Sequence, residues 1–235
     1  MSHQEVNRRD LLAGAGALAG LAAVGGVARA QCCSAEVGGK AKLEMQNADF
    51  YTGGKFDQEK AKDAIIKLCK HHGYHVFPEL RDKLWITDYG TGEFMKVGLA
   101  AYSFVNNVED RYMLMDIFLV PGQMLPEHWH LEGEGNPAKR EGWLIRWGLS
   151  HVVGIGAPNL GKDVVVPKCH WGGKVTVEHE TIATPGTFVK LAEVGTRHWQ
   201  LAGPEGAILS EVANVHTNSA VRHTDPALNA FFLKG

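Results

Sequence analysis

The chain has 235 residues, of which 45% are hydrophobic and 21% charged, a composition typical of a globular protein with one sizeable core. Its formal net charge is −2, and no stretch combines clustered Lys and Arg with aromatic residues. These features exclude recognition of nucleic acid and attraction to an anionic membrane surface. They favour a small, neutral or weakly charged ligand.

The first thirty residues have the pattern of a targeting segment. Arg8 and Arg9 precede a Gly/Ala/Leu run that ends near Val27, and a small-x-small site ends at Ala30. The apolar run is shorter and less hydrophobic than the ~20 residues that a membrane-spanning helix needs. We therefore expect a twin-arginine signal peptide over residues 1–30, cleaved before Gln31. The mature protein would be exported folded to the periplasm or the medium, without stable membrane insertion.

The cysteines do not define a disulfide framework. An even number of cysteines in an oxidising compartment permits pairing, but two of them are adjacent near the expected mature terminus. The sequence therefore fixes no pairing among Cys32, Cys33, Cys69 and Cys169. Export in the folded state suits a metalloprotein, because the metal can be loaded in the cytoplasm, away from the tighter-binding Cu²⁺ and Zn²⁺.

No linker or charge run divides the mature chain, so we expect an extended arm over residues 31–55 and a single domain over residues 56–235. Residues 57–72 have the apolar spacing of an amphipathic helix, with Asp57 as the N-cap and Gly73 at the C′ position. Three histidines surround the end of this helix: His71, His72 and His75. They can be read as a second metal site, although solvated or carbonyl-capping histidines are the simpler interpretation.

After the helix, the sequence has the pattern of a β protein. Short apolar or alternating runs are separated by turns that contain Gly, Pro or Asn, which is typical of a sandwich or a barrel. The expected strands are Leu84–Ile86, Val97–Val105, Tyr112–Val120, Trp143–Trp147, His151–Ile155, Val164–Val166, Val175–Ile182, Thr187–Leu191, Arg197–Leu201 and Ala207–Val215. The segment Cys169-His170-Trp171 is expected in a loop or at a barrel edge.

One stretch carries the strongest chemical signal. In an extended strand, residues two apart face the same side, so His128 and His130 can present both imidazoles to one ion while Trp129 points away. Glu141 can reach the same ion from the next antiparallel strand. Glu134 is the alternative carboxylate, since it lies closer to His130 in sequence.

His198 is the expected fourth ligand. Gly195 supports a turn into a strand that points His198 inward together with Gln200. Three imidazoles and one carboxylate suit Mn²⁺, Fe²⁺, Co²⁺, Ni²⁺ or Zn²⁺ and disfavour Cu⁺, which prefers sulfur ligands.

At this point the sequence resembles the cupin superfamily. The first cupin motif, Gly-x5-His-x-His, an interval and Glu-x6-Gly, is matched with a ten-residue interval, and the second motif is matched in its Gly-x2-His core. The matching residues are Gly122, His128, His130, Glu141, Gly148, Gly195 and His198. The resemblance implies an all-β fold, a cupin barrel of the double-stranded β-helix or jelly-roll type, here with an N-terminal helix. Because cupins often dimerise, it also implies a homodimer.

Within that superfamily, the region from Phe94 to the C-terminus resembles the D-lyxose/D-mannose type of sugar isomerase. The similar segments are Val-Pro-Gly-Gln, Pro-Glu-His-Trp-His, Arg-His-Trp-Gln and Ser210-Glu211-Val212. The resemblance implies a sugar substrate and a metal, with Mn²⁺ preferred, that polarises the carbonyl of an open-chain aldose and stabilises an enediolate. The reaction would interconvert a pentose or hexose pair such as D-lyxose/D-xylulose or D-mannose/D-fructose.

The same resemblance assigns roles to individual side chains. Glu211 would move the proton between C2 and C1, and Arg222 would orient the substrate. Trp143 would stack on the sugar, and Gln200 would contact it. The simpler interpretations are an ion-paired Glu211, a solvated Arg222 and a Trp143 that belongs to the core.

One departure bears on the activity. These isomerases carry a lysine on the strand before the first motif, where this chain has Met115, and methionine cannot move a proton. Lys96 and Lys139 are candidates to replace that amine. The alternatives to an isomerase are an iron dioxygenase with an apolar pocket and a non-catalytic carbohydrate-binding protein. An isomerase requires a carboxylate and a cation beside the metal, so the polarity of the pocket separates these functions.

Overall fold

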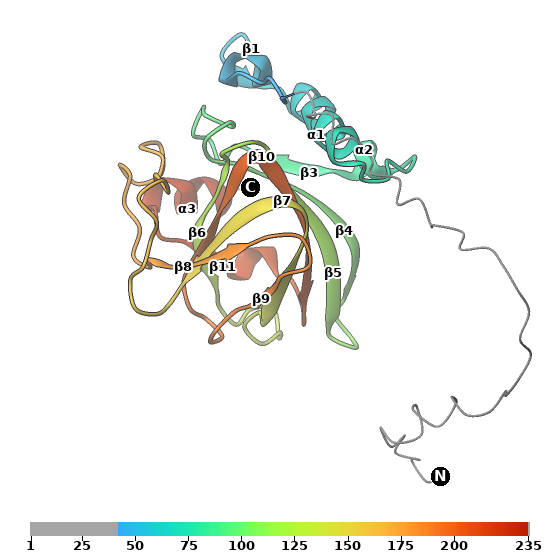
Figure 1. The fold of residues 1–235 in the computed structure, drawn as a ribbon. Helices are drawn as coiled ribbons and strands as arrows, with labels where there is room; N and C mark the ends of the chain where they lie inside the picture. The colour runs from blue at the N-terminus through green and yellow to red at the C-terminus, as the bar shows by residue number, and fades with distance from the viewer. Residues whose placement is uncertain (1–41, 235) are drawn as a thin grey trace, which may run out of the picture. The chain divides into compact units, whose positions relative to one another are not determined.

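The computed structural model describes residues 42–234 (Figure 1). The predicted signal peptide, Cys32 and Cys33 lie outside the described residues. Cys69 and Cys169, which lie within them, are free thiols. Among residues 42–234, no helix is both long enough and apolar enough to cross a membrane.

The N-terminal part of the described chain is folded and not simply extended. Part of the range expected as an extended arm forms a 3₁₀ helix, η1 (Asn47–Phe50), and a small hairpin of β1 (Tyr51–Thr52) and β2 (Lys55–Phe56). Phe50 is buried and its ring lies 4.9 Å from that of Phe94. Burial of aromatic surface against the domain accounts for the ordered conformation of this segment.

The predicted helix is confirmed as α1 (Gln58–His72). The side chain of Asp57 accepts a hydrogen bond from the amide of Lys60, and Gly73 ends the helix with a φ of 74°. Leu68 and Ile65 on its apolar face are fully buried, in a cluster that includes Phe118 from the sheet. The helix therefore covers the outer face of the sheet.

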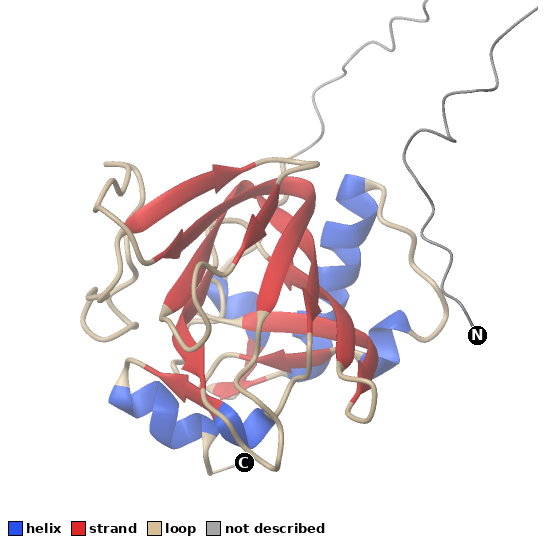
Figure 2. Ribbon diagram, turned by 90° about the horizontal axis from the view of Figure 1, so that it is seen from below, coloured by secondary structure: helices blue, strands red, loops and turns tan. Residues whose placement is uncertain are grey.

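The remaining elements are mostly strands. They are α2 (Leu80–Lys83), β3 (Trp85–Thr87), β4 (Leu99–Asn107), β5 (Tyr112–Leu119), β6 (Met124–His130), β7 (Glu141–Gly154), β8 (His179–Ala183), β9 (Phe188–Lys190), β10 (His198–Ala213), η2 (Asn218–Ala220), β11 (Val221–His223) and α3 (Pro226–Phe232). Figure 2 shows the strands curling around a common interior, with the helices on the outside.

Strand β10 organises the nine-stranded antiparallel sheet of the described chain. The sheet has the order β11-β6-β10-β5-β4-β3, and β7 pairs with β10, β8 and β9. The first half of β10 pairs with β6 and its second half with β5, while β7 follows both halves. Gly148 and Gly206 meet at the bend, both with positive φ, and a Cβ on Gly148 would lie 2.0 Å from the carbonyl oxygen of Gly206. The last glycine of the first motif is therefore required by close backbone contact.

Most expected strands are confirmed, with corrections at the ends and joins. The two segments expected between Trp143 and Ile155 are one strand, β7, and the two expected between Arg197 and Val215 are one strand, β10. Glycine and proline were expected to break them, but here they bend the chain without interrupting the sheet. Residues 164–166 form no strand, and of the expected 175–182 strand only the C-terminal part pairs, as β8.

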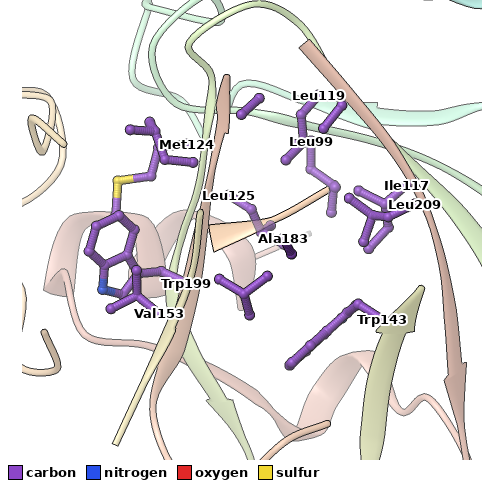
Figure 3. Close-up of a cluster of buried hydrophobic side chains, with 14 of the residues drawn as sticks. Leu99, Ile117, Leu119, Met124, Leu125, Trp143, Val153, Ala183, Trp199 and Leu209 are labelled. Atoms are coloured by element: carbon purple, nitrogen blue, oxygen red, sulfur yellow. The ribbon is translucent and has the colours of Figure 1, made fainter. Parts of the chain in front are cut away.

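The barrel interior is filled by a second apolar cluster. Along β5, Ile117 and Leu119 face inward and Phe118 faces α1, as strand alternation requires. Figure 3 shows Trp199 beside Met124 at one end of the inner cluster. Some members of this cluster, among them Leu99, Ile117 and Leu125, also line the cavity described below.

Candidate active site

Strand β6 turns two histidines into the barrel. His128 and His130 are buried, whereas Trp129 between them faces the other side and stacks 4.4 Å from the Arg197 guanidinium carbon. The strand follows a turn at Gly122, where φ is 69°. The predicted pairing of the two imidazoles on one face is confirmed.

His198 joins this pair from β10. It is the first residue of the strand, lies opposite His128 in the sheet register, and follows a turn at Gly195 with a φ of 78°. Ligand atoms of His128, His130 and His198 all lie within 4.8 Å of one another. The structure thus brings His198 next to two residues that lie about seventy positions earlier in the sequence.

Backbone contacts fix the tautomers of two of these rings. Nδ1 of His128 lies 2.8 Å from the carbonyl oxygen of Pro126, and Nδ1 of His198 lies 3.1 Å from that of Thr196. A carbonyl oxygen can only accept, so each Nδ1 carries the proton and donates it. Each Nε2 is left with a free lone pair, which is the form that binds a metal ion.

Glu141 completes the cluster from the start of β7. Its Oε1 lies 3.2 Å from Nε2 of His130 and 3.2 Å from Nε2 of His198. None of these buried atoms has a partner in hydrogen-bonding geometry among the described residues. Converging nitrogen and oxygen donors without hydrogen bonds fit a divalent cation. Glu134, the alternative, is exposed and accepts a hydrogen bond from Ser219.

A buried lysine lies between two carboxylates next to this cluster. The Nζ of Lys139 forms a close ion pair with Oε1 of Glu211 and lies 3.1 Å from Oε2 of Glu141. The indole N–H of Trp143 donates to Oε2 of Glu211 at 3.1 Å. Both oxygens of Glu211 are therefore held in fixed positions. Lys96, the other candidate amine, is exposed.

The two carboxylates differ in their electrostatic surroundings. Burial alone would raise the pKa of Glu141, but Lys139, His130 and His198 outweigh it and hold that pKa well below its usual range. Burial raises the pKa of Glu211, with Lys139 opposing the rise and Glu141 adding to it. Glu141 thus remains an anion, whereas Glu211 has the higher proton affinity. Such a divergence is the usual basis for one carboxylate binding a cation and another carrying a proton.

A cavity of about 260 Å³ opens beside the cluster. One part of its wall is polar and the other is formed by aliphatic and aromatic side chains. The polar part includes His128, His130, Lys139, Glu211, His216 and His223, and the apolar part includes Trp85, Tyr89, Leu99, Met115, Ile117, Leu125 and Phe232. Its volume is near the lower end of the range for small-molecule sites.

Two predicted substrate residues lie behind the cavity wall. Trp143 is buried, with its ring centroid 5.2 Å from that of His198, and is not among the residues that line the cavity. Trp143 therefore does not offer its ring to a sugar in the cavity, as the resemblance implied. It holds Glu211 through the hydrogen bond from its indole N–H. Gln200 is likewise fully buried, and its side-chain oxygen accepts from the hydroxyl of Ser150 at 2.9 Å.

Arg222 also lies away from the cluster. It pairs with Trp129 in the β11–β6 register, so it faces outward, and its guanidinium donates to the carbonyl oxygens of Val221 and Ser219. Its neighbour His223 pairs with His128 and lines the cavity. No motif spacing in the sequence marks His223. His223 differs from Arg222 only in the face of β11 on which it lies. A strand of three residues is too short to be predicted from the sequence pattern.

The other histidine clusters follow the simpler interpretation. His71, His72 and Glu205 place ligand atoms within 4.8 Å of one another at the end of α1, but Nε2 of His72 already lies 2.9 Å from the carbonyl oxygen of Glu205. His75 is exposed. His170 is buried in a turn, as the loop prediction for its segment requires.

We expect His223 to make the metal-free protein less stable as the pH falls. Burial lowers the pKa of His223 to about 3, against an ordinary value of 6.5, so the unfolded chain takes up a proton that the folded chain excludes. Stability is fully present above pH 6.5 and is lost as the pH falls toward 3. Relative to pH 7.5, the loss at pH 5 should be about 2 kcal/mol.

Urea unfolding of the chelator-treated wild type and the His223→Gln variant at both pH values measures this difference. The comparison between the two proteins removes the contribution of the carboxylates. Equal pH dependence of the two unfolding free energies would contradict the prediction.

No family model matches the chain. Solved structures, however, share its fold. The L-ribose isomerase of Acinetobacter sp. DL28 superposes with a TM-score of 0.57 at 11% identity, over 75% of this chain and 94% of that chain. The L-ribose isomerase of Cellulomonas parahominis superposes with a TM-score of 0.54 at 12% identity, over 75% and 95%. The curled antiparallel sheet is a cupin barrel, and the predicted fold class is confirmed.

Sequence similarity defines the family more narrowly. The chain is 32% identical over 169 residues to the D-lyxose ketol-isomerase of Cohnella laeviribosi, covering 71% of this chain and 90% of that protein. It is 32% identical over 173 residues to the D-lyxose/D-mannose isomerase of Thermosediminibacter oceani, covering 73% and 90%. The chain belongs to the D-lyxose ketol-isomerase family, and its enzyme class is isomerase.

Proposed function

We propose that the protein is a metal-dependent aldose-ketose isomerase that acts on a pentose or hexose, such as the pair D-lyxose and D-xylulose or the pair D-mannose and D-fructose. The observation that carries the proposal is the position of Glu211 and Lys139 on the wall of a cavity that also exposes His128 and His130. A proton carrier and a cation are thereby next to a set of donors that fits a divalent ion. Family membership supports the same reaction class.

The metal would be held by His128, His130, His198 and Glu141. A divalent cation supplies Lewis-acid polarisation of the substrate carbonyl at this position. We propose Mn²⁺ as the preferred ion, since mixed nitrogen and oxygen donors accept it and folded export would allow it to be loaded before competing metals are met. The export itself remains a proposal from Arg8 and Arg9, which precede the described residues.

The protein side chains would then perform the proton transfers. The carboxylate of Glu211 accepts the proton as the C2–H bond of the open-chain aldose breaks, and returns it to C1. The hydroxyl proton on O2 moves to O1, so no oxidant or reductant is consumed. Lys139 and Trp143 keep both oxygens of Glu211 in place. The apolar part of the cavity limits access of water to the reacting carbons.

The alternatives fit the cavity less well. An iron dioxygenase needs little more than the metal ligands and an apolar pocket, and would leave the buried Lys139–Glu211 pair without a use. A purely carbohydrate-binding protein would not need a carboxylate of raised pKa at the reacting end of the cavity. Both alternatives predict no interconversion of sugars.

Metal analysis and sugar NMR test the proposal together. The purified mature chain, loaded with Mn²⁺, is incubated with D-lyxose, D-mannose and L-ribose, and the appearance of the ketose signals is followed. We expect one metal ion per chain and conversion of at least one of the three aldoses. A fully loaded protein that converts no pentose or hexose would contradict the assignment.

Lys139 is expected to replace the amine that Met115 lacks. Met115 lies opposite Glu211 in the β10–β5 register and lines the same cavity, so an amine from either position can reach that carboxylate. Replacing Lys139 by Met should lower kcat about 100-fold, because a charge-assisted hydrogen bond to Glu211 is lost. Adding Met115→Lys to that variant should recover at least about tenfold of the lost rate, within the same range of effects.

Steady-state kinetics of the two variants, with metal content measured in parallel, provide the check. The exposed Lys96→Met variant is the matched control and should retain wild-type rates. A Lys139→Met variant with normal kcat, or a double variant no faster than the single one, would contradict this role.

A further inference from the structure

Two polar side chains of the cavity wall have no partner in the described chain. His223 is 4% exposed, and neither of its ring nitrogens has a hydrogen-bond partner. Tyr89 is 3% exposed, and its ring centroid lies 5.1 Å from that of His223. The backbone amide of Tyr89 donates a hydrogen bond to the side-chain oxygen of Thr87. The hydroxyl of Tyr89 makes no hydrogen bond to any of the described residues. An unpartnered buried polar group costs roughly 1–3 kcal/mol, so the two ring nitrogens of His223 call for an explanation.

Apart from the candidate metal ligands His128 and His130, the other buried polar groups on the wall are already paired. Lys139 contacts Glu211, and His216 lies 2.7 Å from the side-chain oxygen of Asn218 and 3.3 Å from Nζ of Lys139. Away from the candidate metal ligands, the unused hydrogen-bonding capacity of the buried wall is therefore concentrated at His223 and Tyr89. Because both line the cavity, a ligand that enters it can supply the missing partner.

The strand order separates this pair from the proton carrier. His223 lies on β11 and Glu211 on β10, and β6 with His128 runs between these two strands. The ring centroids of His223 and His128 are 5.8 Å apart. An extended five-carbon sugar measures about 5 Å from C1 to C5, given C–C bonds of about 1.5 Å. Because β6 lies between β10 and β11, a sugar whose carbonyl end lies at Glu211 and that crosses β6 has its other end on the His223 side of the cavity.

The surroundings of the pair are apolar. Phe232 of α3 lies with its ring centroid 5.2 Å from that of His223, and Leu125 and Val221 line the cavity nearby. The pair is therefore a hydrogen-bonding position that borders the hydrophobic part of the wall. Sites of this kind reject ligands that lack the matching hydroxyl, because the buried polar groups then stay unpaired.

We propose that His223 and Tyr89 form a specificity-determining pair that hydrogen-bonds the terminal hydroxyl of the sugar, O5 of an aldopentose. The proposal rests on the proposed isomerase function and adds the means by which the chain end is recognised. Recognition of the hydroxyl at this position favours substrates that extend fully across the cavity over shorter or deoxygenated ones.

A cycle that removes the hydroxyl from the sugar and the partner from the protein tests this pairing. The specificity constant kcat/KM is measured for D-lyxose and 5-deoxy-D-lyxose with the Mn²⁺-loaded wild type, His223→Phe and Tyr89→Phe. The preference is the ratio of kcat/KM for D-lyxose to kcat/KM for 5-deoxy-D-lyxose. We expect this ratio to be at least about tenfold larger in the wild type than in His223→Phe, as for the loss of one buried hydrogen bond. Differences in ring form between the two sugars cancel, because they are the same for every protein variant.

Three comparisons make the result specific. His170→Phe changes an equally buried, unpartnered histidine that does not line the cavity, and it should keep the wild-type preference. His223→Gln retains a donor and an acceptor and should recover part of the preference. Tyr89→Phe removes a single hydroxyl, and it should reduce the preference even if His223→Phe fails to fold.

Calorimetry separates failure of this inference from failure of the isomerase assignment. Affinities for the two sugars are measured in the Glu211→Gln background, where slow turnover permits equilibrium binding. Weaker binding of the 5-deoxy sugar that depends on His223 or Tyr89 supports the pairing, whether or not the wild type isomerises sugars. Equal discrimination between the two sugars by the wild type, His223→Phe and Tyr89→Phe, or no sugar binding at all, would overturn it.

Discussion

Replacing His198 by alanine is expected to abolish stoichiometric metal binding and, with it, all measurable isomerase activity. Nε2 of His198 is buried and lies 3.2 Å from Oε1 of Glu141. Without this imidazole, two imidazoles and one carboxylate remain to bind the ion. Removal even of a residue that only orients a ligand commonly weakens metal binding by about 10–100-fold. Loss of a ligand itself should exceed about 100-fold by the same comparison.

Metal content after dialysis and competition with a chelator measure this change directly. The exposed His75→Ala variant removes an imidazole elsewhere and should bind one ion per chain, as the wild type does. Metal should also raise the Tm of the wild type and of His75→Ala but not that of His198→Ala, because only proteins that bind the ion are stabilised by it. Retention of one tightly bound ion by His198→Ala would show that the cluster is not the metal centre.

The cluster of His128, His130, His198 and Glu141 could be predicted from the sequence because the strands and turns that carry it follow local rules. Alternation along one strand places His128 and His130 on the same face, and turns at Gly122 and Gly195 begin the strands that carry the ligands. Gly148 belongs to the same motif for a reason that the sequence does not reveal, since it allows the backbone contact with Gly206. The strand alternation and the two turns depend on neighbours a few residues away and can therefore be predicted from the sequence, whereas the contact of Gly148 cannot.

The rest of the cavity depends on long-range register and was only partly predictable. Lys139 reaches Glu211 across 72 positions, and nothing in its own segment distinguishes it from the exposed Lys96. Arg222 and His223 are adjacent, and which of them faces inward is fixed by the pairing of β11 with β6. A shift of one residue in that register would exchange the two side chains. The depth at which Trp143 is buried likewise depends on long-range packing, through its contact with Glu211.

Replacing Glu211 by glutamine should remove catalysis while leaving the metal in place. The amide cannot accept the C2 proton, so kcat should fall by about 10²–10⁴-fold, the usual contribution of a general acid-base group. Glu211 is not in contact with the three histidines, and Glu141 keeps its ion pair with Lys139 at 3.1 Å. Metal stoichiometry should therefore remain that of the wild type, in contrast to His198→Ala.

Hydrogen exchange identifies the step that is lost. In D₂O, exchange of the proton held by Glu211 with solvent should place deuterium at C1 of the ketose that the wild type forms, whereas Glu211→Gln should form this labelled ketose more slowly by the same factor as kcat. Glu180→Gln is the matched control. Like Glu211, Glu180 is a buried carboxylate with a basic partner, in its case His151, but it does not line the cavity. That variant should lose stability and keep its rate per folded molecule. Both variants change a buried carboxylate to an amide. A rate loss confined to Glu211→Gln would therefore show that the loss comes from the place of Glu211 in the cavity wall, and not from the removal of any buried negative charge. A metal-loaded Glu211→Gln enzyme with wild-type kcat would require a different proton carrier.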